Sequence, residues 1–329
     1  MELASLTDAL TALAPALGGR LADAPRRLSG GASQETWAFD LIIGDDARGL
    51  ILRRRPDGMT PDPGRTVGLS AEAALIRAAG AAGAPVPAVV HVCRPEDGLG
   101  EAYVMARVEG ETLGRRIVRD AAFAAVRPGL AHRCGAVLAA IHSVPTADLP
   151  AIPRSDAAAE LDRYEAIYRQ SGAERPIFEL ALKRLRRHLP QPVEPRLVHG
   201  DFRNGNLMIH PERGLAAVLD WELAHVGDPA ADLGWLCVNS WRFGGDAPVG
   251  GFGHYDDLLA GYVSAGGEPI SLERVRFWQT LGSLKWGVMC LIMYQAYATG
   301  VDPSVERAMI GRRVSETEID LMNLLGAPL

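Results

Sequence analysis

The chain has 329 residues, of which 48% are hydrophobic and 22% are charged. It is longer than the roughly 100–200 residues of one compact domain, so two domains or lobes are predicted. The net charge of −6 and the pI near 5.8 argue against a general nucleic-acid binder, which would carry a basic surface. The four cysteines are scattered without CxxC spacing, which argues against a disulfide framework or a zinc site and favours a reducing compartment.

Neither a signal peptide nor a membrane span is predicted. The opening stretch "MELASLTDALTALAPALGG" carries two acids and no basic segment, so residues 1–24 are predicted to form a leading amphipathic helix. The most apolar later run, "WGVMCLIMYQAYATG", is shorter than the ~18 apolar residues that indicate a membrane helix. We therefore expect a cytoplasmic protein without a membrane or nucleic-acid partner.

After the leading helix, the first third of the chain has strand-like patterns. "RRLS" and "TWAFDLII" flank a glycine turn, and a third short strand covers residues 49–53. A helix begins at about Ser70 and is ended by Gly80 and Gly83. "PAVVHVC" and "EAYVMARV" follow as two more strands. A small lobe of five strands with one inserted helix is therefore predicted.

From "EGETLG" onward, helical patterns dominate. They cover "RPGLAHRCGAVLAAIHSV", "AAAELDRYEAIYRQ", "IFELALKRLRRHL", "YDDLLAGYVSAG" and the long segments 272–300 and 305–325. The predicted fold class is α+β with two lobes. Residues 1–107 form the small N-terminal lobe, residues 108–329 form the larger, mainly helical lobe, and the hinge lies near residues 105–110.

One stretch of the helical lobe, "LVHGDFRNGNLMI", followed by "LDWE", gathers polar side chains between strand-like runs. Asp201 and Asn206 lie in the short loop, and Asp220 ends the next strand. Carboxylate and amide oxygens are the ligands that Mg²⁺ takes, together with substrate phosphates. Phosphoryl transfer needs this metal and a carboxylate beside the attacking hydroxyl. Asp201 is therefore predicted to be the catalytic residue, with Asn206 and Asp220 as metal ligands and Glu222 near a second ion or a water.

These two motifs resemble those of a known family. "HGDFRNGN" matches H-G-D-x-x-x-x-N, and "LDWE" places its Asp nineteen residues after Asp201, as in the aminoglycoside phosphotransferase and choline kinase-like enzymes, relatives of protein kinases. "LSGGASQETW", "LILR", "AYVMARVEG" and "GDPAADLGWL" are similar to further family segments, so the resemblance extends over nearly the whole chain. It implies a protein-kinase-like fold, ATP and Mg²⁺ as cofactors, and a small-molecule hydroxyl substrate.

The resemblance also implies a nucleotide site in the small lobe. The family's nucleotide loop falls on Gly30, Gly31 and Ser33, whose backbone N–H groups would approach phosphates; an ordinary hairpin turn is the alternative. Backbone groups near Met105 and Arg107 are expected to contact adenine.

Related kinases hold the α/β-phosphates with a lysine at the end of the third strand, but the only lysines here, Lys183 and Lys285, lie in the helical lobe. Alignment of "LILR" on that pattern selects Arg53. Glu72 is its expected ion-pair partner, although a favourable charge in a helix's first turn would explain Glu72 equally simply.

Two further residues near the motifs are assigned structural roles. In kinase-like folds the histidine of this motif supports the catalytic loop by hydrogen bonds, so His199 is not assigned to catalysis. Asp232 is expected to anchor the loop backbone from a buried position. Chance polar turns are the alternative explanation for Asp201, Asn206 and Asp220.

The acceptor is indicated only weakly. Polycationic aminoglycosides need a strongly acidic pocket, whereas basic and aromatic residues recur in the late helices, where they are also typical of a helical core. The pattern "WRFGG…GGFGHYDDLLAGY…LKWGV…IGRRVSETE" is similar to kinase domains fused to some acyl-CoA dehydrogenases, which act on hydroxyacyl thioesters. A hydroxyacyl or other small anionic alcohol is therefore the hypothesis. The residues concerned are Trp278, Lys285, Trp286, Tyr294, Tyr297, Arg312 and Arg313.

Other functions remain as alternatives. A true aminoglycoside kinase differs only in its acceptor. A nucleotide-binding pseudokinase is supported only by the arginine at position 53. A hydrolase or dehydrogenase is disfavoured because the chain has no GxSxG, no GxxxxGK[ST] and no HExxH, and "GGFG" at residues 250–253 is incomplete as a dinucleotide motif.

Overall fold

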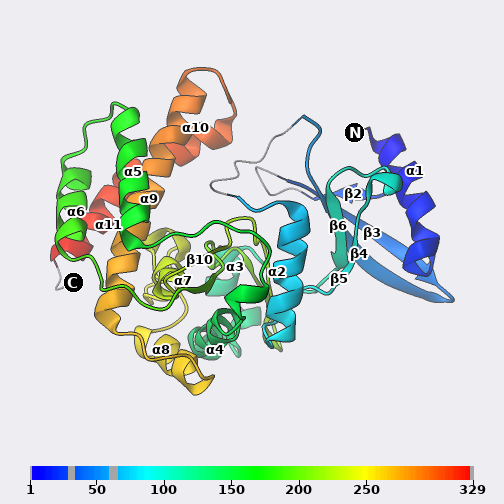
Figure 1. The fold of residues 1–329 in the computed structure, drawn as a ribbon, viewed down its shortest axis with the longest axis horizontal. Helices are drawn as coiled ribbons and strands as arrows, with labels where there is room; N and C mark the ends of the chain where they lie inside the picture. The colour runs from blue at the N-terminus through cyan, green and yellow to red at the C-terminus, as the bar shows by residue number, and fades with distance from the viewer. Residues whose placement is uncertain (1, 29–33, 59–65, 327–329) are drawn as a thin grey trace.

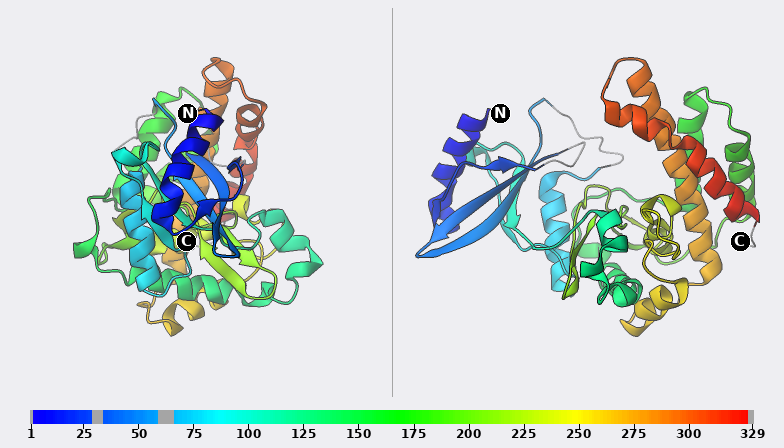
Figure 2. Two further views of the ribbon diagram at one scale, coloured as in Figure 1. Left: turned by 90° about the vertical axis from the view of Figure 1, so that its right-hand side faces the viewer. Right: turned by 180° about the vertical axis from the view of Figure 1, so that it is seen from behind.

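The computed structural model describes residues 2–28, 34–58 and 66–326. A twisted antiparallel sheet with a helix on its outer face is joined to a larger helical body, and the chain termini lie at opposite ends of the molecule (Figures 1 and 2). None of the helices in these residues is long and apolar enough to span a bilayer.

The small lobe is built on one antiparallel sheet of order β1-β3-β4-β6-β5, with β2 paired to β3. Helix α1 packs on one face of the sheet in an apolar cluster with Trp37, Phe39 and Leu50. Helix α2 lies between the sheet and the helical body (Figure 1). The elements are α1 (Leu3–Leu13), β1 (Arg20–Leu21), β2 (Arg26–Arg27), β3 (Glu35–Ile43), β4 (Asp46–Arg54), α2 (Leu69–Ala81), β5 (Val89–Val92) and β6 (Ala102–Ala106).

The leading helix predicted over residues 1–24 is shorter in the structure. It ends at Leu13 and continues only as a 3₁₀ turn, Ala14–Leu17. Gly18 then takes a φ of 87°, which reverses the chain because glycine has no Cβ to oppose that conformation. Residues 20–21 pair with β3 as a sixth strand, β1, so the sheet has one strand more than predicted.

The larger lobe is mainly helical, and the β7–β10 and β8–β9 ribbons lie within it. Its first core cluster also includes Tyr103 and Leu75 of the small lobe, so one apolar core extends across the two lobes. Its elements are α3 (Gly114–Arg119), α4 (Leu130–His142), α5 (Ala157–Gln170), α6 (Pro176–Arg187), β7 (Arg196–Val198), β8 (Leu207–His210), β9 (Gly214–Val218), β10 (His225–Gly227), α7 (Ala230–Leu236), α8 (Tyr255–Ser264), α9 (Leu272–Ala298), α10 (Val305–Gly311) and α11 (Val314–Gly326).

The helical pattern over residues 305–325 is divided in the structure. Helix α10 ends at Gly311, and α11 begins at Val314. Gly311 packs so closely on α9 that a Cβ there would lie 2.6 Å from the Cβ of Tyr294. The periodicity predicted the helical conformation, and this contact accompanies the break.

Candidate active site

The catalytic-loop motif lies between two short strands. β7 ends at Val198, the loop covers residues 199–206, and β8 begins at Leu207. Within the loop, the Asn206 amide Nδ2 donates to the Asp201 side-chain Oδ2 at 2.6 Å and to the Asp201 carbonyl at 3.0 Å. The two polar residues predicted to act together are therefore in direct contact.

Asp220 reaches the same place through the hairpin of β8 and β9. The backbone N–H of Leu219 donates to the carbonyl of Asn206 at 2.9 Å, which fixes the start of β8 beside the residue that follows β9. Asp220 itself has a φ of 67°, a left-handed conformation that is uncommon outside glycine. The structure thus brings Asp201, Asn206 and Asp220 together although they are up to nineteen residues apart.

The expected ion pair of the small lobe is present. Arg53, at the end of β4, lies with Nη1 3.6 Å from Glu72 Oε1 and with Nη2 3.0 Å from Asp220 Oδ1. Glu72 is completely buried and also accepts from the Tyr103 hydroxyl and the Trp221 N–H. Arg53 therefore links the sheet and α2 of the small lobe to Asp220 of the larger lobe.

The electrostatics of this trio follow from its burial. Burial raises the pKa of Glu72, and the charge of Asp220 adds to that rise, while Arg53 opposes it. Burial by itself would lower the pKa of Arg53, but the charges of Glu72 and Asp220 hold that pKa above its ordinary value. Arg53 is consequently a fixed cation in contact with two carboxylates.

His199 and Asp232 have the structural contacts expected of them. Asp232 is buried and accepts from the N–H groups of His199 and Gly200 at 2.8 and 2.9 Å and from His142 at 3.1 Å. His199 accepts the Asp201 N–H at Nδ1, so its Nε2 carries the proton and donates to a backbone carbonyl. Burial lowers the pKa of His199, against the nearby carboxylates, which keeps the ring neutral.

Two partners of Asp201 were not among the predicted site residues. The Trp235 indole Nε1 donates to Asp201 Oδ1 at 2.7 Å, and the Arg203 Nε lies 3.0 and 3.2 Å from the two carboxylate oxygens. Arg203 lies inside the motif, and its position two residues after Asp201 could have indicated it. Trp235 comes from α7, and nothing in the sequence spacing points to that contact.

The structure does not show a ligand-facing position for the other predicted site residues that it describes. Met105 ends up buried in β6, and the side chain of Arg107 points away to Asp40, 2.7 Å distant. The N–H groups of Ala106 and Arg107 already donate to backbone carbonyls, so an adenine contact of this segment has to use a carbonyl oxygen or another residue's N–H. The backbone carbonyl of Glu222 accepts from the Val67 N–H. Gly30, Gly31 and Ser33 lie outside the described residues.

The residues present fit a magnesium ion by the chemistry of their donors. Asp220 offers a carboxylate, and Asn206 offers the carbonyl oxygen of an amide whose nitrogen is turned toward Asp201. The backbone bond from the Leu219 N–H to the Asn206 carbonyl brings the segments that carry these two oxygen donors together. Two such donors match a cation that takes one or two side-chain oxygens and completes its shell with phosphates and water.

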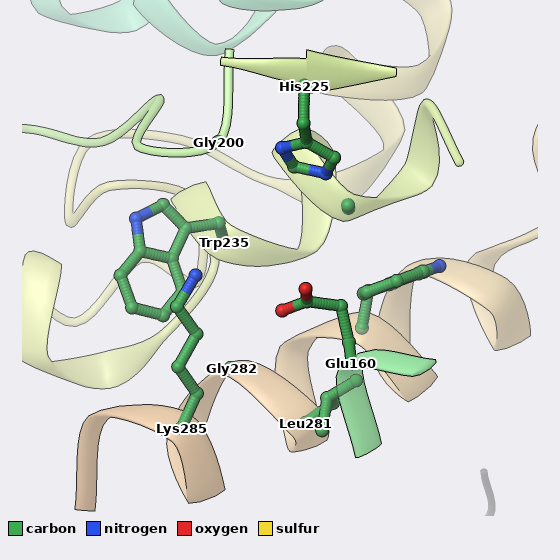
Figure 3. Close-up of a pocket in the computed structure, with 9 residues that line it drawn as sticks. Glu160, Gly200, His225, Trp235, Leu281, Gly282 and Lys285 are labelled. Carbon is green, nitrogen blue, oxygen red and sulfur yellow. The ribbon is translucent and has the colours of Figure 1, made fainter. Parts of the chain in front are cut away.

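A pocket lies beside the catalytic loop, between α5, α7 and α9 (Figure 3). Gly200, Trp235 and Lys285 line it, and the carboxylate of Glu160 faces the same space (Figure 3). The ammonium of Lys285 lies 4.6 Å from the centre of the Trp235 ring, a cation–π distance. Because the Trp235 indole also donates to Asp201, one side chain separates the pocket from the predicted catalytic carboxylate.

Comparison with known proteins identifies the family. A profile described as "Phosphotransferase enzyme family" matches residues 25–278, more than three quarters of the chain. The chain belongs to this phosphotransferase family. The resemblance inferred from the two motifs is confirmed, and so is the two-lobed fold class.

Solved structures of similar proteins share the fold. A Ralstonia eutropha protein assigned as an aminoglycoside phosphotransferase superimposes with a TM-score of 0.75 at 22% identity, covering 97% of each chain. A choline/ethanolamine kinase family protein from Mesorhizobium loti gives 0.63 at 22% identity, covering 99% of this chain and 96% of the other. At these identities the likeness concerns the fold alone.

Curated relatives carry other names. Acyl-CoA dehydrogenase family member 11 of Gallus gallus is 28% identical over 329 aligned residues, covering 91% of this chain and 40% of that protein. Acyl-CoA dehydrogenase family member 10 of Mus musculus is 32% identical over 58% of this chain and 18% of that protein. The chain therefore spans less than half the length of these relatives.

Proposed function

We propose that the protein transfers the γ-phosphoryl group of ATP to the hydroxyl of a small molecule. The observation that supports this most is the contact of Asp201 with Asn206 and of Asp220 with Arg53, which gathers a carboxylate base, two oxygen ligands and a cation in one place. Mg²⁺, when held by Asn206 and Asp220, would supply positive charge that offsets the negative charge of the transferred group.

Each of the proposed site residues has a defined task in this reaction. Asp201 orients the acceptor hydroxyl and takes its proton as the oxygen forms its bond to the γ-phosphorus. The bond between the γ-phosphorus and the β-phosphate oxygen breaks, and ADP leaves. Arg53 holds the nucleotide phosphates, with Glu72 fixing its guanidinium. Asn206 and Asp220 hold the metal.

We further propose that the acceptor is an anionic alcohol, such as a hydroxylated acyl compound, rather than an aminoglycoside. The pocket that Trp235 separates from Asp201 carries an ammonium, from Lys285, on an aromatic wall. A single carboxylate, Glu160, faces it (Figure 3), which is not the strongly acidic lining that a polycation needs. The names of the curated relatives, which refer to acyl-CoA dehydrogenases, agree with acyl chemistry.

The test measures ADP release by the purified protein with ATP and Mg²⁺ against hydroxy acids, hydroxyacyl thioesters and kanamycin. Asp201→Asn is expected to lower turnover at least about 100-fold while ATP binding persists, because general-base catalysis contributes about 10²–10⁴-fold. Asp45→Asn, in the exposed β3–β4 turn, is the control. Faster turnover of kanamycin would overturn the anionic acceptor. ATP binding without turnover of any acceptor would indicate a pseudokinase.

A further inference from the structure

Arg203 is the cation nearest to the predicted catalytic carboxylate, and most of its donors are unused. Its Nε bonds both oxygens of Asp201. An arginine has five N–H donors, and among the described residues the four on its two Nη atoms have no acceptor. Its side chain is 23% exposed. A rigid planar fork of free donors therefore stands beside the reacting group.

The guanidinium is held in place by an aromatic platform. Its Cζ lies 4.5 Å from the centre of the Trp241 ring, which packs at a tilt between Trp235 and Trp286 with ring centres 5.2 and 4.9 Å away. Stacking of this kind fixes the plane of an arginine fork without using its donors. The fork is thus preorganised for a ligand.

Two tryptophans of this platform also carry indole N–H donors that have no acceptor among the described residues. The indole Nε1 of Trp241 is buried and has no hydrogen-bond partner among the described residues, and neither has that of Trp286. A buried N–H without an acceptor is costly, so such groups call for an explanation. The free guanidinium donors of Arg203 are complementary to a group that only accepts, namely an anionic oxygen group.

We propose that Arg203 is a specificity-determining residue that binds a carboxylate or phosphate group on the acceptor. This inference rests on the proposed function. The free Nη donors bind that group while Nε stays on Asp201, so the acceptor is held with its hydroxyl beside the carboxylate.

The experiment uses matched pairs of acceptors on the full chain. 3-Hydroxybutyrate is compared with its methyl ester, and glycerol 3-phosphate with glycerol, so that the carboxylate and phosphate arms are read separately. In the native protein the anionic member of at least one pair should have the higher kcat/KM. Arg203→Gln should raise KM for that member about 10- to 100-fold, the worth of a hydrogen bond to a charged group. The KM for its neutral partner should change less than about threefold.

Two further variants separate recognition from loss of structure. Arg203→Lys keeps the charge but not the planar fork and should recover part of the affinity. Arg213→Gln, an exposed arginine in the β8–β9 turn, should leave both acceptor pairs unchanged. Equal effects of Arg203→Gln on charged and neutral acceptors, or an unaltered preference for the anion, would overturn the proposal.

Calorimetric titration of the anionic probes in the presence of ADP and Mg²⁺ supplies a measurement that does not depend on turnover. Binding to the native protein that is lost in Arg203→Gln supports the anion site even if no phosphate is transferred, in which case only the proposed function fails. If neither anionic probe binds, or if both proteins bind the probe equally, the anion site is refuted.

Discussion

At the scale of single residues, Arg53 is the clearest departure from the family pattern. The guanidinium replaces an ammonium and contacts two carboxylates at once, Glu72 at 3.6 Å and Asp220 at 3.0 Å. A lysine presents a point charge, whereas arginine presents a planar fork that can bond to two groups. The substitution is therefore consistent with a working phosphate site.

Replacement of Arg53 should separate its charge from its geometry. Arg53→Gln is expected to lower the affinity for ATP–Mg²⁺ about 10- to 100-fold because it removes a charged donor to phosphate. Arg53→Lys should lose less than about tenfold. Titration calorimetry measures both, with Arg48→Gln on the exposed part of β4 as the control. Unchanged ATP affinity in Arg53→Gln would remove Arg53 from the nucleotide site.

His199 should make the protein less stable in mild acid. Its pKa in the folded protein is lowered by burial, from an ordinary value of 6.5. As the pH falls below 6.5, the unfolded chain takes up this proton first, so the free energy of unfolding decreases. The contribution of neutral His199 to the free energy of unfolding is complete above pH 6.5 and is lost as the pH falls toward the lowered pKa of the folded protein. The free energy of unfolding then changes by at most about 1.4 kcal/mol per pH unit.

Urea unfolding between pH 7.5 and pH 5 measures this slope. His199→Gln should flatten it, while His254→Gln, at an exposed histidine, should leave it as in the native protein. A slope that is identical in His199→Gln and the native protein would mean that other groups cause the acid sensitivity.

At the scale of elements, helices α4 and α8 cross at unusually short range through two glycines. A Cβ on Gly135 would lie 2.0 Å from the Leu258 carbonyl oxygen, and one on Gly261 would lie 1.9 Å from the His132 carbonyl oxygen. Glycine lowers helix stability by roughly 0.5–1 kcal/mol relative to alanine. The close crossing explains why it is found in the middle of both helices.

Gly135→Ala should therefore destabilise the protein, although alanine is the better helix former. We expect a loss of about 1–3 kcal/mol in the free energy of unfolding, because the helices must move apart to admit a methyl group. Gly129→Ala is the matched control, since nothing lies within 4 Å of a Cβ at Gly129. Equal stabilities of the two variants in urea unfolding would contradict the close crossing.

At the scale of the whole molecule, the two lobes meet at the proposed nucleotide site. Arg53 and Glu72 belong to the small lobe, and they contact Asp220 and Trp221 of the large lobe. A backbone hydrogen bond from Val67 to Glu222 crosses the same boundary. A ligand bound here contacts both lobes, so its binding energy also stabilises their association.

ATP with Mg²⁺ should accordingly raise the melting temperature. Saturation at 100 times the dissociation constant corresponds to about 2.7 kcal/mol, or roughly 4 °C for a chain of this size. EDTA or Asp220→Asn should remove most of this shift, while Asp246→Asn, at an exposed site, should retain it. A shift that survives both EDTA and Asp220→Asn would show that these oxygens hold no metal.

The sequence determined much of this arrangement by itself. Local patterns predicted most helices and strands, because periodicity reports which residues face a core. The motif residues Asp201, Asn206 and Asp220 were predicted together because their oxygen side chains and the spacing of the two motifs resemble those of the family. Glu72 was predicted as the partner of Arg53 by elimination, because only three acids lie between residues 53 and 96.

Only the tertiary structure decided the rest. The donation of Trp235 to Asp201, the stacking of Arg203 on Trp241 and the paired state of the Ala106 and Arg107 N–H groups depend on contacts between elements far apart in sequence. The end of α1 at Leu13 and the strand β1 depend on pairing with β3. Periodicity records the environment of a residue but not the identity of its neighbour, so the contact of Trp235 with the predicted catalytic carboxylate could be found only by folding the chain.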